Sequence, residues 1–127
     1  MLRTVIVDDD RAMRIVGRLL AEEEGCHIVG EAETGEQAVR LAMRLRPDAI
    51  LMDYRMTGMD GIETTRAIVA ARPSVAVIAW TSSDEPAVAE AFLAAGARAH
   101  ALKGDFEALR AALRGAQETL ATGGLEA

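Results

Sequence analysis

The chain has 127 residues, of which 50% are hydrophobic, 27% charged and 3% aromatic. This length suits one domain of ordinary size, and the composition provides an aliphatic core and excludes a disordered chain. The formal net charge of −6 opposes the phosphate backbone of nucleic acids, so we expect no direct nucleic-acid binding.

Two further features bear on location. Cys26 is the only cysteine, which excludes an intrachain disulfide and a cysteine-based zinc cluster and favours a reducing compartment. The apolar run near the N-terminus covers residues 5–7 and is followed by three aspartates, so it is far too short for a signal peptide or a membrane span. We therefore expect a cytoplasmic protein that does not enter the membrane.

The first part of the chain predicts a strand, a helix and a second strand. Residues 5–7 are a β-branched run that ends at Asp8, and apolar residues then recur at helical spacing until Gly25, a residue suited to ending a helix. Residues 27–33 predict the second strand.

The middle of the chain predicts two helices on either side of a buried strand. Thr34 followed by Gln37 three residues later resembles a capping box at a helix start. Residues 49–52 are an uninterrupted apolar run that ends at Asp53, as expected for a parallel strand covered on both faces. A glycine-containing loop then leads to a helix for which Asp60 is the expected N-cap.

The last part predicts two strands and two helices. Residues 75–80 predict a buried strand closing on Thr81, and the helical segment 84–95 follows. A weaker strand at 98–102 ends at Lys103. The final helix carries an apolar stripe made of Phe106, Leu109, Leu113, Ala116 and Leu120. We expect this stripe to pack mainly into the core, with any exposed portion serving a dimer or partner contact.

Alternation of five strand and helix units with short connections predicts a single α/β domain. We expect a doubly wound (βα)5 fold with a five-stranded parallel sheet and right-handed crossovers. Residues 1–120 are assigned to this domain and residues 121–127 to a short tail.

Four residues able to do chemistry stand at predicted strand ends. They are Asp8, Asp53, Thr81 and Lys103. Ligands of such sheets bind beyond the carboxyl ends of the strands, which meet at one edge. We therefore expect these four side chains, distant in sequence, to lie together.

The run Asp8, Asp9 and Asp10 is electrostatically costly unless a cation offsets its repulsion. With Asp53 beside it, the run makes an all-oxygen site suited to a hard divalent cation such as Mg²⁺. In the alternative interpretation these aspartates only cap the following helix and favour its dipole. The expected convergence with Asp53 favours the metal site.

Asp53 is suited to attack a phosphoryl group. A carboxylate with an ordinary pKa of about 3.9 is ionised at neutral pH and needs no general base. Mg²⁺ and the Lys103 ammonium would then supply positive charge, and the Thr81 hydroxyl a hydrogen bond. A lysine or a threonine alone at a strand end is ordinary, but the combination indicates phosphoryl chemistry.

The motifs extend over essentially the whole chain. They are residues 5–10, 48–53 and 58–63, Thr81, and Gly96-Ala97 followed by Lys103. Together they resemble the receiver domain of bacterial response regulators, the signalling module of two-component systems. Residues 29–35, with Gly-Asp after Lys103, are more similar to receivers attached to helix-turn-helix DNA-binding domains of the NarL/FixJ kind.

The resemblance implies a phosphorelay role and the flavodoxin-like strand order 2-1-3-4-5. A sensor histidine kinase or phosphotransfer protein would phosphorylate Asp53, and a conformational change would signal to a partner or output domain. The implied Mg²⁺ ligands are Asp9 and Asp53, Asp8 through water, and the backbone carbonyl of Arg55. Thr81 and Lys103 would contact the phosphoryl group. Such a domain is a phosphoacceptor with self-phosphorylation and self-dephosphorylation chemistry and is not otherwise an enzyme.

Three positions depart from the family pattern or modify it. His100 stands where tyrosine or phenylalanine usually reports the switch, and Gly104 stands where proline is frequent, so we expect a trans peptide bond there. Arg55 lies two residues after Asp53, where it would reach the mouth of the site and alter the lifetime of the phosphate.

Other functions fit the sequence less well. A phosphohydrolase of the haloacid-dehalogenase type requires a second aspartate at the position of Arg55. A flavin-binding domain would require a glycine-rich phosphate loop and flanking aromatic residues. A receiver-like protein-binding domain without activity is a further alternative. The sequence leaves open a free-standing receiver, a piece of a transcription factor whose DNA-binding domain is the output, and a homodimer.

Overall fold

The computed structural model describes residues 1–123, in which strands and helices alternate. The strands are β1 (Arg3–Val7), β2 (His27–Ala32), β3 (Ala49–Met52), β4 (Ala76–Thr81) and β5 (Ala99–Leu102). The helices are α1 (Arg11–Glu23), α2 (Gly35–Leu45), α3 (Gly61–Ala71), α4 (Pro86–Ala94) and α5 (Phe106–Ala121).

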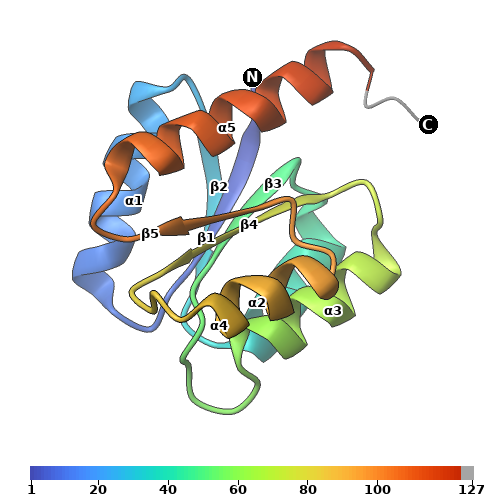
Figure 1. Ribbon diagram of the computed structural model, residues 1–127. Helices are drawn as coiled ribbons and strands as arrows, with labels where there is room; N and C mark the ends of the chain where they lie inside the picture. The colour runs from blue at the N-terminus through green and yellow to red at the C-terminus, as the bar shows by residue number, and fades with distance from the viewer. Residues whose placement is uncertain (124–127) are drawn as a thin grey trace.

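All strands pair in parallel, in the order β2-β1-β3-β4-β5. Figure 1 shows α1 and α5 on one face of the sheet and α2, α3 and α4 on the other. Each face has its own buried aliphatic cluster, and every residue of β3 and β4 is buried because helices cover both faces. The predicted doubly wound (βα)5 fold and its strand order are confirmed.

The helix starts follow the predicted caps with one correction. Asp60 and Glu63 form a reciprocal capping box at α3, so this cap is confirmed. At α2, Thr34 accepts a hydrogen bond from the Gln37 backbone, but the Gln37 side chain accepts from the backbone N–H of Glu33 and not from that of Thr34. The predicted capping box is therefore formed in one direction only.

Most expected boundaries differ from the observed ones by one or two residues. The largest difference for a helix start is at α4, which begins at Pro86 and not at residue 84, because proline at the first helical position needs no hydrogen-bond acceptor. Helix α5 continues to Ala121, one residue into the expected tail, and residues 124–127 of that tail lie outside the described residues. No helix within residues 1–123 is long and apolar enough to cross a membrane.

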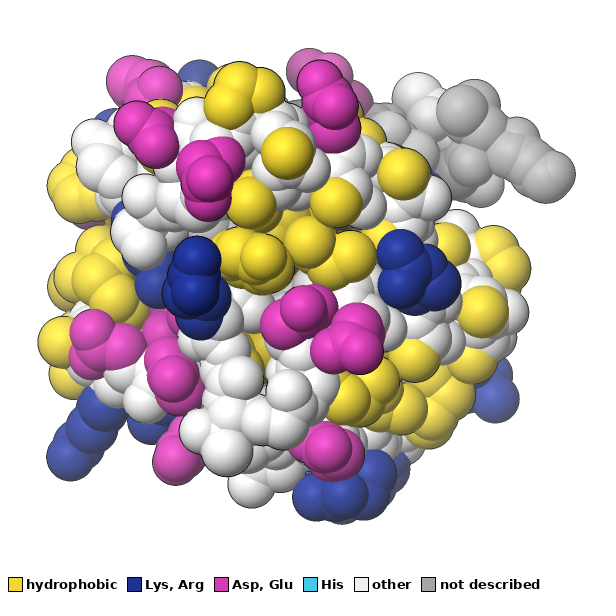
Figure 2. Space-filling model, turned by 60° about the horizontal axis from the view of Figure 1, so that its bottom comes forward, with side chains coloured by type: hydrophobic (Ala, Val, Ile, Leu, Met, Phe, Trp, Pro, Cys, Tyr) yellow, Lys and Arg dark blue, Asp and Glu magenta, His cyan; other side chains and the backbone are white. Residues whose placement is uncertain are grey.

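The apolar stripe of α5 is core only in its middle. Leu109 and Leu113 are fully buried, and Ala116 packs against the same cluster. Phe106 and Leu120, at the two ends of the helix, are 45% and 41% exposed. On the face shown in Figure 2, apolar side chains form a band across the middle, with acidic side chains above and below it and basic ones near its ends. The two ends of the α5 stripe are therefore exposed, and a dimer or partner contact there stays a prediction.

Candidate functional site

The register of the sheet brings the strand ends together. Val7 of β1 pairs with Met52 of β3, so Asp8 and Asp53 follow at the same level. The backbone N–H of Asp53 donates to the carbonyl of Val7. On the other side of β3, the backbone N–H of Lys103 donates to the carbonyl of Thr81. These ends border a cleft of about 570 Å³.

Three carboxylates gather in this cleft. Asp8, Asp9 and Asp53 each place an oxygen within 4.8 Å of the others. Asp8 and Asp53 are buried, whereas Asp9 is exposed at the opening. Because hard divalent cations prefer oxygen ligands at close quarters, this donor set fits Mg²⁺.

The ammonium group of Lys103 offsets part of this negative charge. Its Nζ lies 2.6 Å from Oδ2 of Asp8 and 3.2 Å from Oδ1 of Asp53. Burial alone would lower the pKa of Lys103, but the hydrogen bonds and charges of the two aspartates outweigh burial and raise the pKa above its ordinary value. Lys103 therefore stays charged beside the carboxylate that we expect to react.

Asp53 is harder to ionise than an isolated aspartate. Burial, followed by the charge of Asp8, raises the pKa of Asp53 to about 6, against the opposing effects of Lys103 and the backbone N–H of Tyr54. Our expectation of an ordinary pKa was wrong, because it left out burial. Asp53 is still mainly ionised at neutral pH.

The three consecutive aspartates divide into different roles. Asp10 is the N-cap of α1, and its carboxylate accepts a hydrogen bond from the backbone N–H of Ala12 at 2.9 Å. Oδ1 of Asp8 accepts from the backbone N–H of Asp10 at 2.9 Å. The capping interpretation thus holds for Asp10, while Asp8 and Asp9 belong to the carboxylate cluster.

Thr81 is brought to the same edge, but its hydroxyl has other partners. Oγ1 lies 3.2 Å from Nε2 of His100 and donates to the carbonyl of Ser83 at 3.4 Å. Burial lowers the pKa of His100, so its imidazole is neutral at pH 7. We did not predict this contact, although the pairing of Ala79 with His100 makes Thr81 and His100 diagonal neighbours on one face of the sheet.

Aromatic contacts connect His100 to the mouth of the cleft. The ring of Phe92 lies between those of His100 and Tyr54, with ring centroids 6.4 and 6.0 Å apart. The guanidinium carbon of Arg55 lies 5.3 Å from the centroid of Tyr54. Arg55 borders the cleft, so it does reach the mouth of the site. Its effect on the lifetime of the phosphate stays a prediction.

A glycine maintains the loop after Asp53. The backbone N–H of Gly61 donates to the carbonyl of Tyr54 at 2.7 Å. A Cβ at this position would overlap the carbonyl oxygen of Asp53. Glycine at the start of α3 is therefore required for the loop to close against the site. No peptide bond is cis in the described chain, so the trans geometry expected before Gly104 is confirmed.

A parallel five-stranded α/β domain with an acidic cluster and a lysine at its strand ends defines a receiver-type domain. Residues 4–114 match the response regulator receiver domain family, and the chain belongs to this family. The resemblance seen in the sequence is confirmed.

Two curated relatives are transcription and response regulators. Response regulator GacA of Pseudomonas viridiflava is 37% identical over 105 residues, which cover 82% of this chain and 49% of that protein. Transcriptional regulatory protein LiaR of Bacillus subtilis is 36% identical over 121 residues, covering 91% of this chain and 57% of that protein. The chain thus spans about half the length of these relatives.

Solved receiver domains share the whole fold. The receiver domain of the response regulator NarL from Mycobacterium tuberculosis superposes with a TM-score of 0.81 at 32% identity, covering 96% of this chain and 97% of that one. The receiver domain of AraT from Geobacillus stearothermophilus superposes with a TM-score of 0.85 at 29% identity, covering 96% of this chain and 97% of that one. The similarity to NarL-type receivers is therefore also confirmed.

Proposed function

We propose that this domain accepts a phosphoryl group on Asp53 from a sensor histidine kinase or a phosphotransfer protein. The observation that carries the proposal is the meeting of three carboxylates with the Lys103 ammonium at the ends of β1, β3 and β5. One oxygen of Asp53 forms a bond to phosphorus while the bond from phosphorus to the donor's imidazole nitrogen breaks. The imidazole leaves with the electron pair and takes a proton.

The same carboxylates are the proposed Mg²⁺ site. Asp9 and Asp53 would bind the ion directly, Asp8 through water, and the backbone carbonyl of Arg55 would complete the protein ligands. Bound Mg²⁺ supplies positive charge to the phosphoryl oxygens. Lys103, already held between two carboxylates, adds a second positive charge on the side of β5.

Signalling requires the hydroxyl of Thr81 to change its partner. In the structure this hydroxyl contacts His100 and the carbonyl of Ser83. We propose that it moves to a phosphoryl oxygen after Asp53 is phosphorylated, which removes a contact of His100 and alters the surface of α4, β5 and α5. Leu93 on α4 and Leu102 on β5 are 50% and 36% exposed, so they would contact a partner that binds this altered surface.

The output is proposed to be a partner protein or a DNA-binding domain, in the same chain or detached. LiaR is named as a transcriptional regulatory protein, and its similarity covers 91% of this chain but only 57% of LiaR. A contact between two copies of the domain would be a further readout. The family match favours this phosphoacceptor role over the phosphohydrolase alternative, for which Arg55 occupies the position of the required second aspartate.

Labelling with radioactive acetyl phosphate tests the proposal. The wild type should gain acid-labile label in Mg²⁺ and little in EDTA, and Asp53→Asn should gain none. Glu118→Gln, an exposed change on α5, is the matched control and should label like the wild type. Equal labelling of Asp53→Asn would reject the phosphoacceptor, and equal labelling in EDTA would reject the metal requirement.

A further inference from the structure

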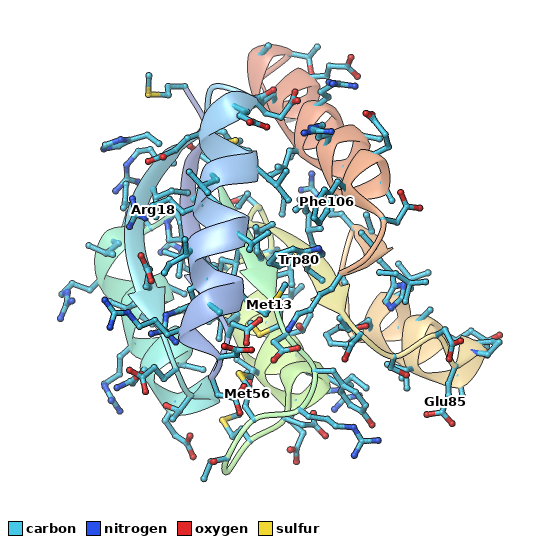
Figure 3. All side chains as sticks on the ribbon, turned by 90° about the vertical axis from the view of Figure 1, so that its left-hand side faces the viewer. Met13, Arg18, Met56, Trp80, Glu85 and Phe106 are labelled. Carbon is cyan, nitrogen blue, oxygen red and sulfur yellow. The ribbon has the colours of Figure 1, made fainter. Side chains whose placement is uncertain are left out.

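The single tryptophan of the chain lies next to the site without belonging to the cleft. Trp80 precedes Thr81 in β4, so the two side chains point to opposite faces of the sheet. The indole is 1% exposed and belongs to the core under α1 and α5. Figure 3 shows Trp80 between α1, near Met13, and the start of α5, where Phe106 lies. Among the described residues, Nε1 has no hydrogen-bond partner.

The indole also contacts the lysine of the site. Nζ of Lys103 lies 5.8 Å from the centroid of the Trp80 ring. The same ammonium nitrogen lies 2.6 Å from an oxygen of Asp8 and 3.2 Å from an oxygen of Asp53. A cation over an indole face is attracted by the ring quadrupole, most strongly where water is excluded. Lys103 is therefore held by an aromatic ring as well as by two carboxylates.

Helix α1 fixes the position of this ring. Gly17 lies in the middle of α1, and a Cβ added there would be 2.9 Å from Cζ3 of Trp80. Glycine in a helix interior is disfavoured relative to alanine, so its use here needs a reason. The close approach of α1 to the indole provides it, because alanine would push the ring.

We propose that Trp80 is a positioning residue for phosphoryl transfer. Packed against Gly17, the indole restricts the flexible lysine stem and keeps the Lys103 ammonium between Asp8 and Asp53. A charge held in place before the reaction stabilises the charge that develops on the phosphoryl group without first having to be ordered. Because this role deepens the proposed function, it depends on phosphoryl transfer at Asp53.

Rates of phosphorylation by acetyl phosphate in Mg²⁺ test the role. Trp80→Leu should react roughly three- to tenfold more slowly, since the cation–π contact is lost. Trp80→Phe keeps an aromatic face and should recover part of the rate. Ile78→Val is the control, because Ile78 is buried on the same face of β4 and in the same cluster. Unfolding curves identify conditions in which every variant is folded.

A double-mutant comparison adds the support from α1. Gly17→Ala should slow phosphorylation in the wild-type background, because the displaced indole moves the ammonium. In the Trp80→Leu background the same change should have no further effect. Additive effects in the two backgrounds would show that Gly17 acts independently of the indole and would contradict the proposed support.

Tryptophan fluorescence tests the contact between Trp80 and Lys103 directly. It requires neither a substitution of Trp80 nor phosphorylation. Trp80 is the only source of tryptophan emission, so Lys103→Met in metal-free buffer should shift or intensify that emission. Unchanged emission would overturn the contact. If the wild type takes up no phosphate, the proposed function fails. If the wild type is labelled and Trp80→Leu reacts at the same rate, the positioning role fails.

Discussion

The buried position of Asp53 makes its ionisation costly for the folded protein. Its pKa is raised to about 6, whereas the unfolded chain has a value near 4. Below pH 4 both states hold the proton, and above pH 6 neither does. Between these values only the folded state is protonated, so the stability due to this proton is lost as pH rises toward 6.

Asp53→Asn removes a buried negative charge that destabilises the folded protein at neutral pH. Without divalent cations, we expect the variant to be about 2–3 kcal/mol more stable than the wild type at pH 7.5. The difference should shrink toward pH 4. Urea unfolding at the two pH values measures it, with the exposed Glu118→Gln as control. A stability difference that does not change with pH would contradict the raised pKa.

The pKa of His100 is shifted in the opposite direction to that of Asp53. Burial lowers its pKa below the ordinary 6.5, so the unfolded chain takes up the proton first as pH falls. Its contribution to stability is therefore present at neutral pH and is lost as pH falls through about 6.5. An NMR titration of the His100 ring should give a midpoint below 6.5. A midpoint at or above that value would contradict the lowered pKa of His100.

At the scale of elements, the connection between β3 and α3 depends on Gly61, which has no side chain. Gly61→Ala would place a methyl group on the carbonyl oxygen of Asp53 and force the loop away from the site. We expect a loss of about 1–3 kcal/mol in stability, as for overpacking, together with weaker Mg²⁺ binding by calorimetry.

Gly115→Ala is the matched control for this substitution. Gly115 lies in α5 with nothing within 4 Å of an added Cβ, so alanine there should stabilise the helix by about 0.5–1 kcal/mol. If both substitutions were neutral or stabilising, the β3–α3 loop would not need glycine at position 61.

The elements and their meeting point could be predicted from the sequence, because apolar periodicity and parallel-sheet topology determine where strands end. Asp8, Asp53 and Lys103 were expected together on this basis, and they lie together. The partners of individual side chains could not be predicted in this way. The contact of Thr81 with His100 depends on strand register, and the indole under Lys103 depends on how closely α1 approaches β4.

At the scale of the whole molecule, carboxylates from the ends of different strands tie metal binding to folding. Asp8 and Asp9 follow β1, Asp53 follows β3, and the unfolded chain does not hold these groups together. A ligand that binds only the folded state stabilises it by RT ln(1 + [L]/Kd), or about 1.4 kcal/mol at ten times the Kd. Mg²⁺ should therefore raise the unfolding temperature.

Variants within the aspartate run separate this effect from general screening of the net charge of −6. Asp9→Asn should lose the stabilisation by Mg²⁺. Asp10→Asn should keep it, because asparagine caps a helix as well as aspartate does and Asp10 caps α1. NaCl at equal ionic strength shows what screening alone contributes.

The effect of Mg²⁺ should also depend on pH, because a proton on Asp53 competes with the ion. With a pKa of about 6 in the absence of metal, Asp53 is mostly protonated at pH 5 and mostly ionised at pH 7.5. Stabilisation by the same Mg²⁺ concentration should therefore be larger at pH 7.5. Thermal unfolding at both pH values, with and without Mg²⁺, measures this difference. Equal stabilisation at both pH values, or stabilisation kept in Asp9→Asn, would place the ion elsewhere than at the ends of β1 and β3. Stabilisation matched by NaCl would mean that Mg²⁺ acts only by screening the net charge.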